Sequence, residues 1–256
     1  MDSPATTPIS AVIITLNEER NIGRCLASIQ PVVDEIIVID SCSTDRTAAI
    51  CEEYEVRFIK RKWAGYAQTK NFANGLANHQ YVLSIDADEA LSPALQLEIE
   101  KAKGKGLEGI YSFNRLTNYC GHWVRHGGWY PDVKARLFPK SVANWEGNYV
   151  HEEIQFSGNP TKQHLQGDLL HYSIYSVKDH LDRVEKYTDL GAQKMLAAGK
   201  KGGRISGVLS AFSRFVRMYF LKLGFLDGWA GWKISTISAK ASYLRYRKLE
   251  HLRANG

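Results

Sequence analysis

Two carboxylates stand two residues apart in Asp86-Ala87-Asp88, directly after an apolar run at residues 81–85. Such a run is typical of a buried strand in a parallel sheet, and on an extended chain residues i and i+2 project to the same side. Open α/β sheets bind ligands at the carboxyl ends of their strands. Two like charges at that edge favour a divalent cation holding a phosphate, although an isolated Asp-x-Asp is more often a solvated loop or a helix cap.

The elements that must position these carboxylates alternate between strand and helix. Apolar, β-branched runs predict strands at residues 11–16, 35–40, 56–60 and 81–85, and capping residues and apolar periodicity predict helices between them. Strands separated by helices imply right-handed βαβ units and a parallel sheet. The sequence therefore predicts an α/β fold.

Polar side chains follow each of the predicted strands. Because right-handed crossovers bring the carboxyl ends of parallel strands to one edge, we expect these groups to gather there: Thr15-Leu16-Asn17-Glu18-Glu19, Asp40-Ser41, Arg61-Lys62 and Asp86-Asp88. Asn17 is also expected to cap the helix that follows the first strand. Helix capping would explain each of these polar groups alone, but not their presence after all four strands. An acid after the second strand suits a nucleoside, and the acids after the fourth strand suit a metal diphosphate.

Several classes of protein lack their signals here. No G-x-G-x-x-G follows the first predicted strand and no G-x-x-x-x-G-K-[ST] occurs, which disfavours dinucleotide oxidoreductases and P-loop NTPases. The net charge of +6 fits an anionic membrane, a phosphorylated substrate or nucleic acid. Because the chain carries no recognised nucleic-acid motif, no nucleic-acid partner is expected.

The composition is that of a globular protein, with 44% hydrophobic and 23% charged residues in a chain of 256. The four cysteines form no C-x-x-C pair, which indicates a reducing, cytoplasmic setting. The polar first residues contain no signal-peptide core, and no stretch of about 18 residues is free of charge. We therefore expect neither secretion nor a transmembrane helix.

Four segments carry a resemblance to a known family: SAVIITLNEE, EIIVIDSCSTDRT, GYAQTKNFA and YVLSIDADE. Together and in this order they resemble a family 2 glycosyltransferase, over about the first 170 residues. Three later segments, GGWYPDVKARLF, Val150-His151-Glu152-Glu153 and Leu170-His171-Tyr172-Ser173, are similar to the bacterial group that builds the lipopolysaccharide core. The resemblance implies the GT-A fold, a mostly parallel central sheet flanked by helices, here with a C-terminal helical extension.

The resemblance also implies roles for individual residues. The nucleoside is expected to be held by Thr15-Leu16-Asn17, Glu19 and Asp40, and the diphosphate to lie near Lys70. In Asp86-Ala87-Asp88, the second carboxylate is expected to bind Mg²⁺ or Mn²⁺ and the first to lie near the ribose. A late histidine serves as an additional metal ligand in some members of the fold, and His171 is the candidate here, with a hydrogen-bonded structural histidine as the alternative.

The implied reaction is inverting transfer from a nucleotide-sugar, most simply a UDP-sugar, to a glycan or glycolipid in lipopolysaccharide core or cell-envelope polysaccharide synthesis. Inversion needs one carboxylate base for the acceptor hydroxyl, and Glu152 is the candidate, with Glu153 next. Two alternatives stay open. A polyprenyl-phosphate glycosyltransferase would need no base, and a non-catalytic sugar-nucleotide-binding protein would need no chemistry at all.

The C-terminal quarter of the chain has a different pattern. Gly199-Lys200-Lys201-Gly202-Gly203 suggests a boundary between a catalytic domain at residues 1–200 and an extension at 201–256. On a helix at 208–223, Arg214, Arg217 and Lys222 face away from an apolar stripe, and Trp229 and Trp232 follow. Such a segment suits peripheral binding to the inner face of the cytoplasmic membrane. Packing on the catalytic domain or on a second subunit is the alternative, and the sequence does not indicate an oligomeric state.

Overall fold

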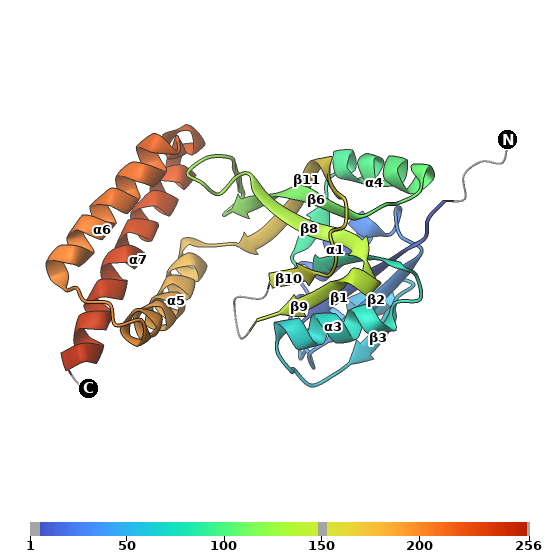
Figure 1. Ribbon diagram of the computed structural model, residues 1–256, viewed down its shortest axis with the longest axis horizontal. Coiled ribbons are helices and arrows are strands. Elements are labelled where there is room, and N and C mark those ends of the chain that lie inside the picture. The colour runs from blue at the N-terminus through green and yellow to red at the C-terminus, as the bar shows by residue number, and fades with distance from the viewer. Residues whose placement is uncertain (1–5, 148–152, 255–256) are drawn as a thin grey trace. The chain divides into compact units, whose positions relative to one another are not determined.

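The computed structural model describes residues 6–147 and 153–254 (Figure 1). The chain divides into two compact units, one of Met1–Arg115 and Asp132–His171 and one of Leu116–Pro131 and Tyr172–Gly256. The boundary expected after residue 200 therefore differs from the observed division, because the helix before the glycines packs against the last helix of the chain. No helix of the described residues is both long enough and apolar enough to cross a bilayer.

The first unit is built on a mixed sheet that is parallel where the sequence predicts it. The strands β3 (Arg57–Lys60), β2 (Glu35–Asp40), β1 (Ile9–Thr15) and β4 (Tyr81–Asp86) lie side by side and run parallel. The order continues through β8 (Asp132–Pro139), β6 (Ile110–Tyr119), β11 (Lys162–Ile174) and β5 (Glu89–Leu91). Here β8 is antiparallel to β4 and β6, and β5 is antiparallel to β11. The parallel half brings the carboxyl ends of β1, β2 and β4 to one edge.

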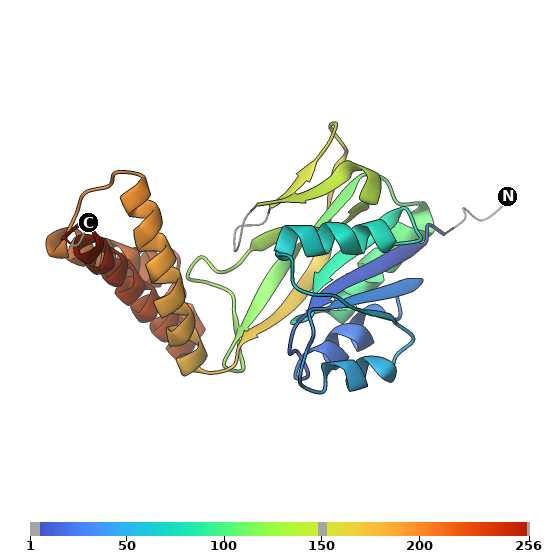
Figure 2. The same cartoon turned by 90° about the horizontal axis from the view of Figure 1, so that it is seen from below.

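Elements cover both faces of this sheet because its central strands are apolar on both sides. Ala11 and Ile13 of β1 face a core shared with α1 (Ile22–Ile29), α2 (Thr47–Glu52) and α4 (Pro93–Lys105). Val12 and Ile14 face the opposite core, which α3 (Tyr66–Leu76) and the hairpin of β9 (Ala143–Glu146) and β10 (Glu153–Phe156) complete. Figure 2 shows α3 on the other side of the strands from α1 and α2.

Two helices begin at serine caps of the kind that a sequence alone can indicate. The Ser92 side chain accepts a hydrogen bond from the Leu95 amide, and Pro93 occupies the first turn of α4. Ser176 and Asp179 form a reciprocal capping box at the start of α5 (Val177–Ala197).

The predicted cap at Asn17 is wrong. Helix α1 begins only at Ile22, and Asn17 has a φ of 55° in the loop before it. The Asn17 side-chain oxygen instead accepts a hydrogen bond from the Thr44 backbone amide at 2.8 Å. The Asn17 backbone amide donates to Ser43 Oγ at 2.8 Å. Asparagine tolerates this left-handed conformation better than most residues. It therefore ties the loop after β1 to the loop after β2.

The second unit is a set of helices with a short strand, β7 (His122–Val124), paired to the end of β6. Helix α7 (Gly228–Ala254) packs against both α5 and α6 (Arg204–Val216). A π-helical turn, η2 (Arg217–Leu221), and a 3₁₀ turn, η3 (Gly224–Asp227), connect α6 to α7. A small core of Tyr119, Val124, Ile174, Met218, Ala230 and Ile234 joins β6, β7 and the helices.

Candidate active site

The acids of Asp86-Ala87-Asp88 lie at the carboxyl end of β4, as the sequence predicts, but their surroundings differ. The chain turns at Ala87 and Asp88 before β5 begins, so the alternation of an extended strand does not apply to the pair. Asp86 is held by cations on both carboxylate oxygens, with Lys70 Nζ 2.8 Å from Oδ1 and Arg136 Nη2 2.8 Å from Oδ2. The charge of Asp86 is therefore paired on both oxygens, and its expected place near the ribose stays a prediction.

The charge of Asp86 is strongly stabilised. Burial alone would raise the pKa of this carboxyl, but the nearby charges of Lys70 and Arg136 outweigh burial and hold the pKa well below its ordinary value. Lys70 is itself buried, and its ammonium lies 4.3 Å from the centre of the Trp145 ring. Lys70 thus lies beside Asp86, and its expected place near the diphosphate stays a prediction.

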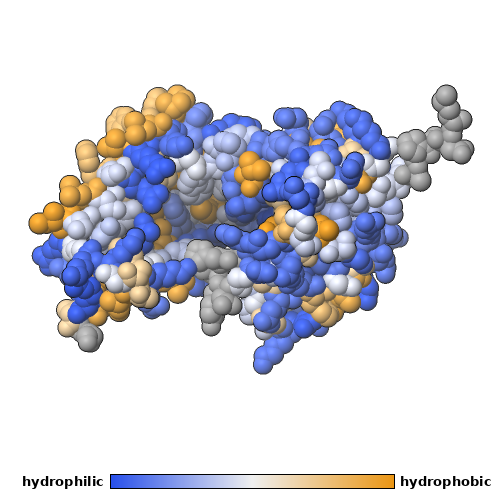
Figure 3. Space-filling view, in the orientation of Figure 1, coloured by the Kyte–Doolittle hydropathy of each residue, from blue (hydrophilic) through white to orange (hydrophobic). Residues whose placement is uncertain are grey.

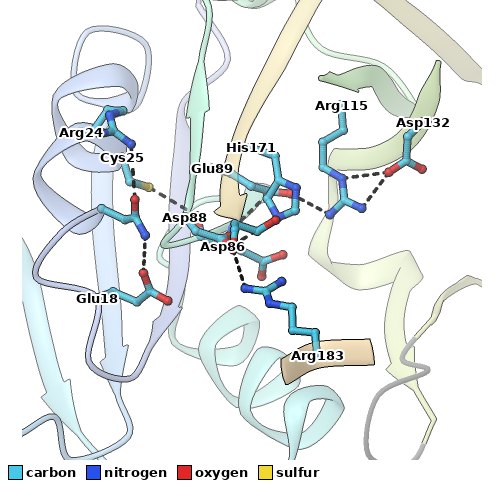
Figure 4. Close-up of polar contacts among 12 residues, drawn as sticks. Glu18, Arg24, Cys25, Asp86, Asp88, Glu89, Arg115, Asp132, His171 and Arg183 are labelled. Atoms are coloured by element: carbon cyan, nitrogen blue, oxygen red, sulfur yellow. Dashed lines mark hydrogen bonds and ion pairs between the residues drawn. The ribbon is translucent and has the colours of Figure 1, made fainter. Parts of the chain in front are cut away.

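A buried acid, Glu89, forms the floor beneath the turn. Its Oε1 accepts a hydrogen bond from Arg136 Nη2 at 2.8 Å, and its Oε2 accepts one from the Asp86 amide at 3.1 Å. Arg115 lies 3.4 Å from the same Oε1 and 2.7 Å from Asp132 (Figure 4). This network fixes the backbone on which both predicted site acids stand.

Sequence reasoning missed Glu89, Arg115 and Arg136 as residues of the site. Arg136 offered a usable signal, since it interrupts an otherwise apolar strand segment, Ala135-Arg136-Leu137-Phe138. An arginine that is buried in a sheet needs an acidic partner, and the acids at the end of β4 are among the candidates for that partner.

Asp88 and His171 come together across the sheet edge. Antiparallel pairing of β11 with β5 places His171 opposite Glu89, and His171 Nε2 lies 3.3 Å from Asp88 Oδ2 (Figure 4). Both side chains are partly exposed, at 15% for His171 and 22% for Asp88. The two residues that the sequence analysis expects as metal ligands are thus adjacent in space.

The donor set at Asp88 fits a substrate-bridged cation better than a metal cage. The described part of the chain holds no cluster of three or more histidine, cysteine, aspartate or glutamate side chains arranged for a metal. Mg²⁺ commonly binds through one or two carboxylates together with substrate phosphates and water. Cys25 donates to the Asp86 carbonyl at 3.7 Å, and burial, with Glu89 next, raises its pKa far above the ordinary thiol value. The thiol is therefore held in its protonated form by these surroundings.

The nucleoside end of the predicted site is an interlocked pair of loops after β1 and β2. Asp40 is fully buried and accepts hydrogen bonds from the amide and the hydroxyl of Ser43. Glu19 accepts one from the Arg46 amide at 3.0 Å. In the structure Asp40, Glu19 and Asn17 therefore shape the two loops, while Leu16 is 49% exposed between them.

Two hydroxyls beside these loops have no partner among the described residues. Thr15 Oγ1 and Ser41 Oγ are both buried and make no hydrogen bond within the part of the chain that the structure describes. Thr15 ends β1 and Ser41 directly follows β2, and the Ser41 amide donates to the Thr15 carbonyl at 2.8 Å. A buried hydroxyl without a partner costs about 1–3 kcal/mol, so this pair marks a place where a ligand would be favoured.

Glu152, the predicted base, lies outside the described residues, and so does His151 beside it. Glu153 begins β10, where it pairs opposite Glu146 and is exposed.

The glycine- and aromatic-rich loop after β6 belongs to the second unit. Trp129 packs against Tyr119 and His180, with ring centres 6.0 and 6.1 Å apart. Trp123 is partly exposed and contacts the Tyr172 ring. Trp129 therefore packs this loop against the core, and Trp123 remains accessible.

Comparison with known proteins identifies the family. The glycosyl transferase family 2 model matches residues 10–180. An uncharacterized glycosyltransferase of Rickettsia felis is 31% identical over 94% of this chain and 89% of its own length. The lipopolysaccharide core biosynthesis glycosyltransferase LpsC of Rhizobium meliloti is 29% identical over 93% of each.

A solved structure is similar over part of its length. A glucosyl-3-phosphoglycerate synthase from Mycobacterium tuberculosis, crystallised with Mn²⁺, uridine diphosphate and glucosyl-3-phosphoglycerate, is 26% identical with a TM-score of 0.37. That match covers 44% of this chain and 44% of the synthase. With the family match over most of its length and a mostly parallel sheet flanked by helices, the chain belongs to glycosyl transferase family 2 and has the GT-A fold.

Proposed function

We propose that the protein is an inverting, metal-dependent glycosyltransferase that moves a sugar from a UDP-sugar to a glycolipid or glycan of the cell envelope. The observation that carries this proposal is the pairing of Asp88 with His171 directly beside the neutralised Asp86. It places one carboxylate and one imidazole next to each other, on a backbone that buried ion pairs hold in place.

Asp88 and His171 are the residues that would hold Mg²⁺ or Mn²⁺. When bound, the cation stabilises the negative charge that grows on the leaving diphosphate as the bond to the anomeric carbon breaks. Lys70 and Arg136 cancel the charge of Asp86, so the site does not repel the diphosphate as three free acids would. The chain's own part in leaving-group departure is thus to orient two donors and suppress local repulsion.

The loops after β1 and β2 are the proposed nucleoside site. Leu16 offers an exposed apolar side chain, and Thr15 Oγ1 and Ser41 Oγ offer hydroxyls without other partners among the described residues. A nucleoside pairs an apolar base face with polar edges, which such a set can contact. Asn17, Glu19 and Asp40 support this site by holding the two loops together.

Glu152 is the proposed base that removes the proton from the acceptor hydroxyl. A carboxylate close to this hydroxyl is sufficient for a single inverting displacement. The proposal rests on the position of Glu152 in the Val150-His151-Glu152-Glu153 segment.

A glycolipid of the lipopolysaccharide core is the proposed acceptor, and the inner face of the cytoplasmic membrane is the proposed place of reaction. The relative from Rhizobium meliloti, which is named for lipopolysaccharide core biosynthesis and aligns along nearly the whole chain, supports this assignment.

Nucleotide-dependent thermal stability tests the proposed function. A ligand that binds the native state raises the melting temperature, and at equal concentration a ligand that binds more tightly raises it further. We expect UDP to raise it more in the presence of Mn²⁺ than in its absence, and more than other nucleoside diphosphates do. Asp88→Ala should abolish the effect of Mn²⁺ on UDP binding.

Asp182→Ala is the matched control, because Asp182 is an exposed acid that contacts only Lys178 among the ion pairs of the structure's described residues. The control should respond to UDP and Mn²⁺ as the wild type does. A wild type that responds to no nucleotide, or an Asp88→Ala variant that keeps the full response to Mn²⁺, contradicts the proposal.

A further inference from the structure

The second unit exposes a large apolar surface where α6 turns into α7. We call this surface the α6–α7 turn face; its most exposed members include Leu209, Phe212, Phe220, Leu221, Leu226 and Trp232. Leu221 is 73% exposed and Phe212 68%. Figure 3 shows apolar side chains along α6 and around the turn. Contiguous apolar patches on this scale mark interaction sites in soluble proteins.

The packing of α6 explains why its large side chains remain outside. Helix α6 approaches α7 through Gly207, where an added Cβ would lie 3.1 Å from the Tyr243 ring. This close contact uses a small residue of α6, and the bulky Leu209 and Phe212 of the same helix remain exposed. The stripe is thus not consumed by packing within the unit, contrary to the usual role of such a stripe.

Aromatic contacts make the surface continuous across the turn. Phe215 stacks on Tyr219 with ring centres 5.2 Å apart, and both rings contact Trp232 at the start of α7. Phe220 packs on the same cluster. Large aromatic residues with a polar group, such as tryptophan and tyrosine, favour the boundary between lipid and water.

The charge around this surface is almost entirely positive. Residues 204–233, which run from α6 through the turn to the start of α7, contain five lysines and arginines and one acid, Asp227. The Asp227 side chain is only 7% exposed, and its oxygens accept hydrogen bonds from the amides of Arg125 and His126. The single negative charge of this segment is therefore turned inward, and the surface presents cations around an apolar centre.

We propose that the α6–α7 turn face docks on an anionic lipid bilayer. Apolar and aromatic side chains enter the boundary between headgroups and acyl chains, while surrounding residues such as Arg217, Lys222 and Lys233 contact anionic headgroups. A second copy of the chain fits less well, because two such faces would bring like charges together. Nucleic acid fits less well, since the centre of the face is apolar. The inference deepens the proposed function, on which it rests for its lipid-linked acceptor.

Vesicle flotation of the full-length protein tests the proposal. We expect the wild type to float with vesicles of phosphatidylcholine and phosphatidylglycerol, to bind phosphatidylcholine alone weakly, and to lose binding as salt rises. Phe212→Ser with Leu221→Ser, and separately Arg217→Glu with Lys222→Glu, should each weaken binding by at least about tenfold. Emission from Trp229 and Trp232 should shift to shorter wavelength when the wild type binds.

Matched controls replace residues of the same kind in the first unit. Leu97→Ser with Val133→Ser removes two exposed apolar side chains, and Lys105→Glu with Lys162→Glu makes the same change in net charge. Both controls should bind vesicles like the wild type, and all variants should keep the UDP-dependent rise in melting temperature. That nucleotide response separates failure of this inference from failure of the proposed function.

Three results would overturn the docking proposal. The first is a wild type that does not bind anionic vesicles at low salt, and the second is equal loss of binding in the controls. The third is a dimer in solution, by light scattering, that the Phe212→Ser, Leu221→Ser variant converts to a monomer, since that places a second copy on the face.

Discussion

Arg136 Nη2 lies 2.8 Å from Oε1 of Glu89, and the two side chains are 6% and 0% exposed. The same guanidinium nitrogen contacts Asp86. One buried cation thus pairs with both the acid beneath the turn and the first acid of the Asp86-Ala87-Asp88 segment. The turn that carries Asp88 therefore depends on this cation for its charge balance.

Arg136→Met tests this dependence. Removal of one partner leaves Glu89 charged and buried, which typically costs about 3–5 kcal/mol of the free energy of unfolding. Urea denaturation should show a loss of this size, and Arg136→Met combined with Glu89→Leu should recover part of it. Arg253→Met, at an exposed position of α7, should change the free energy by less than about 0.5 kcal/mol. Equal urea midpoints for Arg136→Met and Arg253→Met would show that the ion pair does not hold the turn.

Thr15→Val separates stability from ligand binding. Thr15 Oγ1 is buried with no hydrogen-bond partner among the described residues, so its loss should leave the free energy of unfolding unchanged or raise it by up to about 1 kcal/mol. Loss of a nucleoside contact should at the same time weaken UDP binding by about fivefold or more. Calorimetric titration with UDP and urea denaturation measure the two effects. A variant that binds UDP as the wild type does would remove Thr15 from the nucleoside site.

Chelation and His171→Ala test the metal site together. EDTA should remove the Mn²⁺-dependent part of UDP binding in the wild type. His171→Ala should weaken UDP binding with Mn²⁺ more than with Mg²⁺, because Mg²⁺ takes oxygen ligands and gains little from an imidazole. His164→Ala, at an exposed histidine of β11, is the control. A His171→Ala variant with unchanged affinity in both metals would limit the proposed ligand set to Asp88.

Glu152→Gln tests the proposed base and one of the alternative functions. The variant should keep UDP binding and lose sugar transfer by about 10²–10⁴-fold, because the acceptor hydroxyl keeps its proton. Transfer from a labelled UDP-sugar to lipopolysaccharide from a strain lacking the gene measures this loss, and Glu153→Gln should transfer normally. Full transfer by Glu152→Gln would favour a polyprenyl-phosphate acceptor, which needs no base.

The parallel half of the fold was predictable because local pattern and global position agree there. The run Glu35-Ile36-Ile37-Val38-Ile39-Asp40 is buried on both faces, and its bounds match β2 in the structure. The caps at Ser92 and Ser176 were equally readable, since a capping side chain and its target amide lie within three residues of each other. Signals of this kind depend only on neighbours in sequence.

The rest depended on partners that are distant in the chain. Asn17 has the side chain of a helix cap, but its hydrogen bonds go to Ser43 and Thr44 in another loop. Arg136 and Glu89 are partners only because β8 pairs with β4. The pairing of β11 with β5 likewise places His171 beside Asp88. The order of the motifs suggested that His171 and Asp88 act together, but no local pattern could show that the two side chains are close in space.

His180 should make the stability of the protein depend on pH near neutrality. Burial, with a smaller contribution from Arg183, lowers the pKa of His180 to about 4, against about 6.5 in an unfolded chain. Between these values the unfolded state binds the extra proton, so stability is complete above pH 6.5 and falls as the pH drops toward 4. The full loss is about 3 kcal/mol. Asp86 does not contribute in this window, because its lowered pKa affects stability only below about pH 4.

Urea denaturation at pH 7.5 and pH 5 measures this dependence. Between pH 7.5 and pH 5 the wild type should lose about 2 kcal/mol of its free energy of unfolding, because pH 5 lies about 1.5 units below the unfolded pKa. His180→Asn places an amide where Nδ1 meets the Tyr119 hydroxyl at 3.1 Å, and it should remove most of the difference because asparagine does not titrate. His164→Asn should keep the wild-type difference. If His180→Asn also loses stability as the wild type does between pH 7.5 and 5, the acid sensitivity arises from groups other than His180.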